Sequence, residues 1–180
     1  MNVICFNAEK LYRLSYDYFH YEGNIKLAEA CVNKALKYDK KQVKGLLLKG
    51  NILMSKDDIK GAIAILKKAL KEDAKNKECL YLMAKAYSLN GMHQAAIDIL
   101  DKIFIFQISD MEFLSDCYEL KINILMELQK YKKAEQILKS LNNRLLSQDI
   151  FYLKENFYKI IQNNAYFARK NNNRILHVNF

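Results

Sequence analysis

The chain has 180 residues, of which 51% are hydrophobic and 27% charged, and a formal net charge of +9. This balance is typical of an ordered globular protein and excludes an intrinsically disordered chain. No apolar run approaches the ~18 residues of a membrane span, the first residues show no secretory signal, and the absence of proline favours uninterrupted helices.

The first pair of helices is predicted over residues 9–42. A short lead-in contains Asn7, a candidate cap, and helical spacing then predicts helices over 10–21 and 25–38 around a turn at 22–24. Tyr16 stands where later units carry a small residue. The end of an array tolerates this bulk because no preceding helix presses against it.

The second pair is predicted over residues 43–76. Leu46, Gly50 and Leu53 recur at helical spacing, and Gly50 is small enough to let another helix approach closely. Polar residues around Asp57 break this pattern and predict a turn. The helix that follows carries one apolar stripe, formed by Ile59, Ala62, Ile63, Leu66, Ala69 and Leu70.

Two further pairs are predicted over residues 77–110 and 111–148. The fourth is offset, because Ala134 comes one helical turn later than the interval from Ala62 to Ala96 would place it. Ser109 and Glu112 have the spacing of a capping box, which predicts a helix over 110–128. A second helix is expected over 132–141.

One last helix is predicted over residues 149–163, within a capping helix and tail at 149–180. Its apolar residues Ile150, Leu153, Phe157 and Ile160 would close the open end of the stack. An asparagine run at 171–173 is expected to stop any further helix. The apolar residues after it are expected to be extended and to fold back on the last helix or to form a homodimer.

These pairs repeat with a constant period. Ala28, Ala62 and Ala96 are equally spaced, and the turn positions Gly23, Asp57 and Gly91 keep the same interval. A two-helix unit of about 34 residues with a small residue in the first helix and alanine in the second resembles the tetratricopeptide repeat (TPR). The resemblance implies an all-α fold: a right-handed superhelical solenoid of antiparallel helix pairs, with about four repeats and a C-terminal capping helix, in a single domain over 1–180.

The resemblance also implies a concave groove, lined by the first helices, in which another protein or peptide binds. Asparagine would bond a peptide backbone, lysine and arginine would meet carboxylates, and leucine, methionine and tyrosine would offer apolar pockets. The groove positions are Lys10, Arg13, Asp17, Lys44, Leu47, Asn51, Met54, Tyr81, Lys85, Glu119 and Asn123.

Chaperone-binding members of this family hold a C-terminal carboxylate with a clamp of Lys, Asn, Asn, Lys and Arg. The matching positions here are Arg13, Asp17, Leu48, Glu78 and Leu82. Only the first keeps its charge and two are apolar, which argues against that function.

The positive charge is local. Residues 43–76 carry eight Lys and Arg against four Asp and Glu, whereas residues 77–110 carry three against four. The excess lies mostly on second helices, which form the outer face of such a stack, so a solvated face explains it better than nucleic-acid binding does. RNA binding is retained as the alternative function.

No catalytic, metal or cofactor motif stands out. His20, His93 and His177 lack a second ligand at metal spacing, and there is no phosphate loop or nucleophile motif. Cys5, Cys31, Cys79 and Cys117 are scattered, as expected of reduced thiols in a cytoplasmic protein, two of them buried. The sequence therefore predicts a non-enzymatic adaptor or scaffold.

Overall fold

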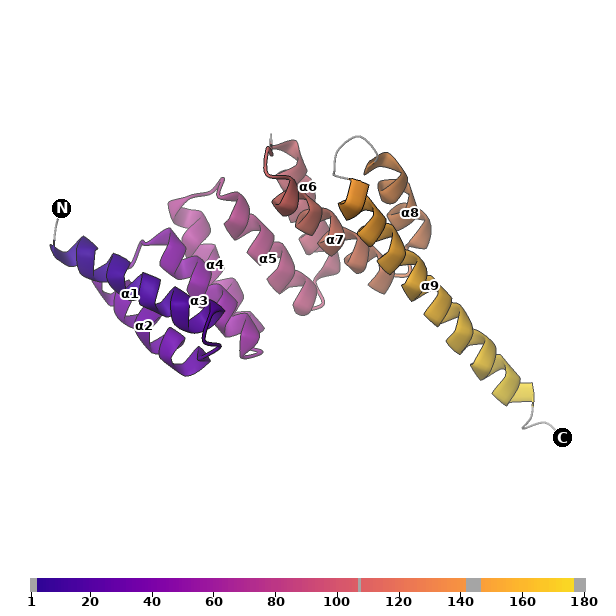
Figure 1. Cartoon of the computed structure of the whole chain (residues 1–180), viewed down its shortest axis with the longest axis horizontal. Coiled ribbons are helices and arrows are strands. Elements are labelled where there is room, and N and C mark those ends of the chain that lie inside the picture. The colour runs from indigo at the N-terminus through magenta and orange to yellow at the C-terminus, as the bar shows by residue number, and fades with distance from the viewer. Residues whose placement is uncertain (1–2, 107, 142–146, 177–180) are drawn as a thin grey trace. The chain divides into compact units, whose positions relative to one another are not determined.

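The computed structural model describes the backbone of residues 3–106, 108–141 and 147–176, and the side chains of residues 7–106, 108–141 and 148–163. Within these ranges the chain is helical and holds no strand (Figure 1). The helices are α1 (Val3–His20), α2 (Ile25–Tyr38), α3 (Val43–Ser55), α4 (Ile59–Glu72), α5 (Lys77–Leu89), α6 (His93–Ile105), α7 (Met111–Glu127), α8 (Tyr131–Ser140) and α9 (Ser147–Leu176). The predicted all-α solenoid of helix pairs is confirmed.

The chain divides into two compact units, Met1–Gln107 and Ile108–Phe180. The first unit contains the first three predicted repeats, and the second contains the fourth repeat and the last helix. Each unit is described by itself, and the expected single domain over 1–180 stays a prediction.

In the first unit, successive helices pack as the pairs α1–α2, α3–α4 and α5–α6, and each pair contacts the next. The first helices also contact one another, α1 with α3 and α3 with α5. Within the described residues no such contact joins α2 to α4 or α4 to α6. Because the first helices lie closer together than the second helices do, α1, α3 and α5 form the inner layer of this unit.

The positions that keep the repeat period lie where paired helices cross. Ala28, Ala62 and Ala96 are fully buried. Gly50 is equally constrained, because a Cβ atom there would lie 2.8 Å from Cδ2 of Leu66 in α4. Such a separation is well inside ordinary carbon–carbon contact, so the predicted close approach at Gly50 is confirmed.

Tyr16 stands in α1 at the position that Gly50 takes in α3, where the atoms nearest to an added Cβ belong to Leu66 of the same helix pair. That Tyr16 is tolerated because no preceding helix presses against it stays a prediction. In α1 the neighbouring Ser15 takes the buried position and its hydroxyl donates to the carbonyl of Ala28 at 2.7 Å. Tyr16 turns outward and is 38% exposed.

The turns inside the pairs share one backbone conformation. Gly23, Asp57 and Gly91 have φ of 64°, 63° and 74°, and Gln129 has φ of 56° in the turn of the fourth pair. The interval from Gly91 to Gln129 equals the interval from Ala96 to Ala134, and both exceed the repeat period by the same offset. For a residue other than glycine this left-handed conformation costs about 1–2 kcal/mol. Packing of the paired helices therefore imposes the turn even where the local residue resists it.

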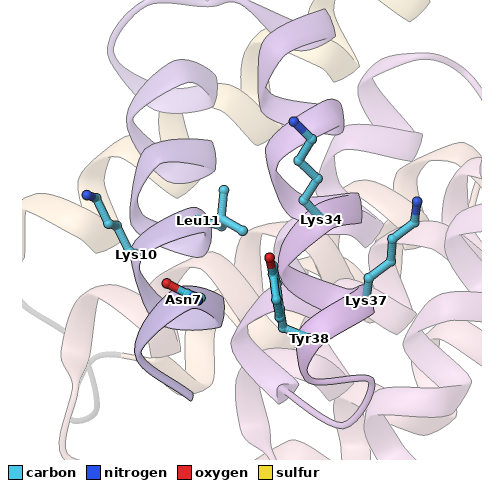
Figure 2. Close-up of a pocket in the computed structure, with 6 residues that line it drawn as sticks. All are labelled: Asn7, Lys10, Leu11, Lys34, Lys37 and Tyr38. Atoms are coloured by element: carbon cyan, nitrogen blue, oxygen red, sulfur yellow. The ribbon is translucent and has the colours of Figure 1, made fainter. Parts of the chain in front are cut away.

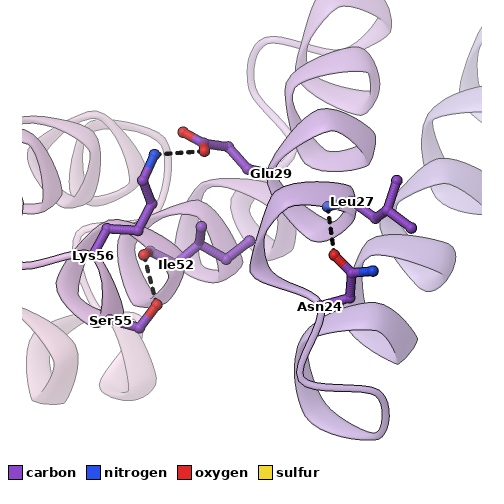
Figure 3. A network of polar contacts seen from close by, with 6 residues as sticks. All are labelled: Asn24, Leu27, Glu29, Ile52, Ser55 and Lys56. Carbon is purple, nitrogen blue, oxygen red and sulfur yellow. Dashed lines mark hydrogen bonds and ion pairs between the residues drawn. The ribbon is translucent and has the colours of Figure 1, made fainter.

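Side-chain caps fix where α2 and α4 begin. The Asn24 side chain accepts a hydrogen bond from the backbone N–H of Leu27 at 3.2 Å, and Asp58 accepts one from Gly61 at 2.9 Å. Figure 3 shows the first of these caps beside an ion pair of 2.6 Å between Lys56 and Glu29, which joins the second pair to the first. Each cap satisfies a backbone donor that the helix itself cannot.

In the second unit α7 packs with α8, and α9 contacts both. Ile150, Leu153 and Phe157 of α9 are buried, as predicted, and close this end of the unit. Ile160 is 36% exposed and does not belong to the buried set.

Three helix ends differ from the prediction in their cap or by several residues. α1 begins at Val3, so Asn7 lies inside the helix and is not its cap. In α7 the cap is Asp110, whose side chain accepts from the N–H of Phe113 at 3.0 Å, and Ser109 lies outside the helix. Asp110 places its carboxylate within reach of the third N–H of the helix, which leaves no capping role for Ser109.

The third difference is the length of α9, which continues past residue 163 to Leu176 (Figure 1). It runs through the asparagines at 171–173, because asparagine lowers helix propensity by only about 0.7 kcal/mol relative to alanine. Residues 174–176 are thus helical and not extended. Residues 177–180 lie outside the described residues, and the predicted packing or dimerisation of this end stays a prediction.

The cysteines fit the sequence analysis where they are described. Cys79 and Cys117 are fully buried, and burial raises the pKa of each thiol from 9.0 to about 12. Cys31 is half-buried, and all three are free thiols. The side chain of Cys5 lies outside the described residues.

Candidate functional site

The first helices of the first unit carry most of the predicted groove residues, and the solvent-facing side chains of α1, α3 and α5 are called here the inner face. Arg13, Asp17, Lys44 and Lys85 are exposed there. Asn51, Met54 and Tyr81 are half-buried, as expected of side chains at the edge of a core. The inner face therefore combines fixed apolar surface with mobile charges and one amide.

Leu47 does not belong to this surface. It is 4% exposed and packs in a core cluster with Leu82 and Cys79. The prediction fails because Leu47 points at the junction of α3 and α5, which the sequence spacing does not reveal. Met54 and Tyr81 are only partly buried and pack against the same cluster.

Opposite charges are interspersed on the inner face. Glu9 accepts from Arg13 at 3.1 Å and from the Gln42 amide at 3.3 Å. The pKa of Tyr12 is raised, chiefly by burial and then by charge repulsion from Glu78 and other groups. A surface of mixed charge suits a protein ligand better than a polyanion.

A cluster of exposed aromatic rings at the end of α1 was not predicted. The rings of Tyr16 and His20 have centroids 4.2 Å apart, and Tyr21 lies 6.2 Å from Tyr16. Tyr21 is 79% exposed. The signal was present in the sequence, because Tyr12, Tyr16 and His20 follow one another at four-residue spacing and so share a helix face.

Glu119 and Asn123 lie on α7 in the second unit, the first half-buried and the second exposed. Asn123 lines a pocket of about 480 Å³ together with Met126 and Glu127 of α7 and Ile160 of α9. The exposure of Ile160, unexpected from the sequence, is explained by its place at this pocket.

The carboxylate clamp of the chaperone-binding members is missing. Leu48 and Leu82, at two of the five clamp positions, are 4% and 6% exposed and belong to the core. They cannot donate hydrogen bonds to a carboxylate from there.

No group of three His, Cys, Asp or Glu side chains is placed to hold a metal ion among the residues described. His93 is half-buried at the start of α6, as its counterparts Ile25 and Ile59 are in α2 and α4. Across the described helices, none has both the length and the apolar character needed to cross a membrane.

Helix pairs stacked with a common inner layer define the chain as a helical-repeat protein. Its structure is similar to that of MamA, with a TM-score of 0.65 and 18% identity, covering 85% of this chain and 81% of that one. It is also similar to PilF of Pseudomonas aeruginosa, with a TM-score of 0.68 and 19% identity over 93% of this chain and 78% of that one.

A tetratricopeptide repeat protein from Parabacteroides merdae shares the fold as well, with a TM-score of 0.65 and 20% identity over 87% of this chain and 61% of that one. The sequence of residues 53–105, which includes α4, α5 and α6, matches the tetratricopeptide repeat family. The family match covers this part of the chain, and the similar structures show that the chain shares the fold of tetratricopeptide repeat proteins. No curated protein matches its sequence.

Proposed function

We propose that the protein is a non-enzymatic adaptor that binds a peptide or helix of a partner protein on the inner face of its first unit. The observation that carries this proposal is the packing of α1, α3 and α5 into one layer, which aligns their solvent-facing side chains. Tetratricopeptide repeat proteins generally act by binding other proteins, and the match of residues 53–105 to this family supports the same role here.

Each part of the inner face has a chemical task in this proposal. Met54 and Tyr81 supply apolar contact area on a rigid support, because both pack against the buried core. Asn51 can donate to and accept from the backbone of a bound segment. Lys44 and Lys85 are exposed and would pair with carboxylates at the edges of the contact.

Variants of the inner face test the proposal. Asn51→Ala, Tyr81→Ala and Lys85→Glu together should abolish capture of the native partner from lysate while leaving the unfolding transition nearly unchanged. The matched control reverses Lys67 and Lys68, which are exposed on α4, and should bind like the unaltered protein. Mass spectrometry identifies the partner, and calorimetry with the purified partner measures the loss.

RNase treatment separates this function from the alternative. If capture depends on RNA, falls steeply with salt and is lost in the Lys67 and Lys68 control, the protein is a nucleic-acid-binding repeat protein. Equal capture by all variants would show that the partner binds elsewhere.

We also propose that the protein works in the reducing cytoplasm. Support comes from the three described thiols, all of them free, two of which are fully buried. Proteins of oxidising compartments usually pair their cysteines. Cell fractionation of the tagged native protein checks the location.

A further inference from the structure

A pocket of about 590 Å³ lies between the two helices of the first pair, on α1 and α2. Figure 2 shows Asn7, Lys10 and Leu11 on α1, and Lys34, Lys37 and Tyr38 on α2. Of the predicted groove residues the pocket contains only Lys10 of α1, and it contains none of the residues given a task in the proposed function. Its volume is within the range of ligand-binding clefts, about 300–1,000 Å³.

The rim of this pocket is strongly basic. Three of its six described lining residues are lysines and none is a carboxylate. In the described part of the chain, Lys10, Lys34 and Lys37 form no ion pair and no hydrogen bond, whereas Lys41 and Lys56 are paired with glutamates. The positive charges of these three lysines are therefore not paired with a carboxylate among the described residues, unlike those of Lys41 and Lys56.

Helix stability explains only part of this charge. Lys37 lies in the last turn of α2, where a cation interacts favourably with the helix dipole. Lys10 belongs to the other helix and gains nothing from that dipole. Its place on the same rim needs another explanation.

The floor of the pocket is apolar and aromatic. Leu11 is half-buried between the helices, and the ring of Tyr38 is 49% exposed beside it. In Figure 2 the lysine side chains stand around this floor and do not converge on one point. Such an arrangement does not fit a single compact ion. It fits an extended chain that lies across the pocket and meets the lysines one after another.

We propose that this pocket binds an acidic segment of a partner protein, with one apolar side chain on Leu11 and Tyr38 and flanking carboxylates on the lysines. Lys34 and Lys37 hold the carboxylates over α2, and Lys10 holds those over α1. The net charge of +9 favours an acidic partner in the encounter as well. This docking surface is additional to the inner face and does not depend on it.

The test uses the full chain and fluorescent synthetic peptides, with binding followed by anisotropy. The probe carries one phenylalanine flanked on each side by glutamates, and the comparison peptide has glutamine in their place. Lys34→Glu with Lys37→Glu should weaken binding of the glutamate peptide about tenfold or more. Lys132→Glu with Lys133→Glu, the same change of net charge on exposed positions of α8, should alter it less than twofold. Tyr38→Ala should weaken the phenylalanine peptide and leave a version with glycine at that position unaffected.

Three results would overturn the proposal. Equal losses in the two double variants would show that only net charge matters. Equal affinity for the glutamate and glutamine peptides would show that carboxylates are not recognised. Tighter binding of a single-stranded RNA with the same dependence on Lys34 and Lys37 would make the pocket a nucleic-acid site. Circular dichroism of each variant verifies that the helices are intact.

The inner-face variant separates this inference from the proposed function. Asn51→Ala with Lys85→Glu should lose the native partner and keep the acidic peptide. The Lys34 and Lys37 variant should lose the acidic peptide and keep whatever binds the inner face. Loss of the acidic peptide in the inner-face variant would show that the peptide binds there, and would refute a separate site.

Discussion

Replacing Gly50 by alanine tests the packing of the helix pairs most directly. The added methyl carbon would lie 2.8 Å from Cδ2 and 3.0 Å from Cγ of Leu66, where carbon atoms in contact normally lie about 3.5–4.0 Å apart. Leu66 is fully buried, so any shift of its side chain must displace neighbouring core residues. Overpacking of this kind costs about 1–3 kcal/mol, whereas glycine to alanine within a helix gains about 1 kcal/mol. The free energy of unfolding should therefore stay unchanged or fall by up to about 2 kcal/mol.

A double-mutant cycle isolates the contact. Leu66→Ala alone should cost about 2–5 kcal/mol, because it leaves a cavity. In that background the methyl group of Gly50→Ala has room, and the same substitution should now stabilise by about 1 kcal/mol. Urea denaturation followed by circular dichroism measures all four proteins. If Gly50→Ala stabilises the native background as much as the Leu66→Ala background, the close contact does not exist and the reasoning fails.

Two further predictions concern the turns and the thiols. Gln129→Gly should raise the free energy of unfolding by about 1 kcal/mol and Gly23→Ala should lower it by about 1–2 kcal/mol, as measured by thermal denaturation; no change in either would show that φ at these turns is unimportant. Because burial raises the pKa values of Cys79 and Cys117 to about 12, the folded state holds these protons more tightly than the unfolded state does. The contribution of each thiol to the free energy of unfolding should be fully present below pH 9 and should fall by about 1.4 kcal/mol per pH unit above it. Alanine at the same position should remove this slope. An alkylating reagent at pH 8 should modify the half-buried Cys31 well before Cys79 or Cys117, as followed by mass spectrometry. Equal rates would contradict the burial of Cys79 and Cys117.

The boundaries of the second helices were predictable because several local signals agree there. α2 begins at Ile25 and ends at Tyr38, as predicted, since Asn24 caps its start and an apolar stripe fixes its length. The ends of α1 and α9 were not predictable in this way. Both continue through residues that are poor helix formers or candidate caps, because a helix already begun adds each further residue at small cost.

Residue spacing placed the first-helix residues on a face but could not say how deep each lies. Lys44 and Leu47 are both groove positions by spacing, yet the first is exposed and the second is buried against α5. The depth is decided by the neighbouring first helix, which is separated in sequence by an entire repeat. The pocket between α1 and α2 was not foreseen for a related reason, because Lys10 lies on one helix of the pair and Lys34 and Lys37 lie on the other.

The sequence by itself determined the repeat, because a constant period in small residues, apolar stripes and turn positions is a local property that each unit carries independently. The position of the fourth turn follows in the same way, because the interval from Ala96 to Ala134, counted from Gly91, ends at Gln129. Only the tertiary structure decided which first-helix side chains reach solvent, which lysines share one rim, and that α1, α3 and α5 form the inner layer. These properties arise from contacts between different helices, and the free energy of such contacts depends on the packing of whole helices and not on the residues of any single one.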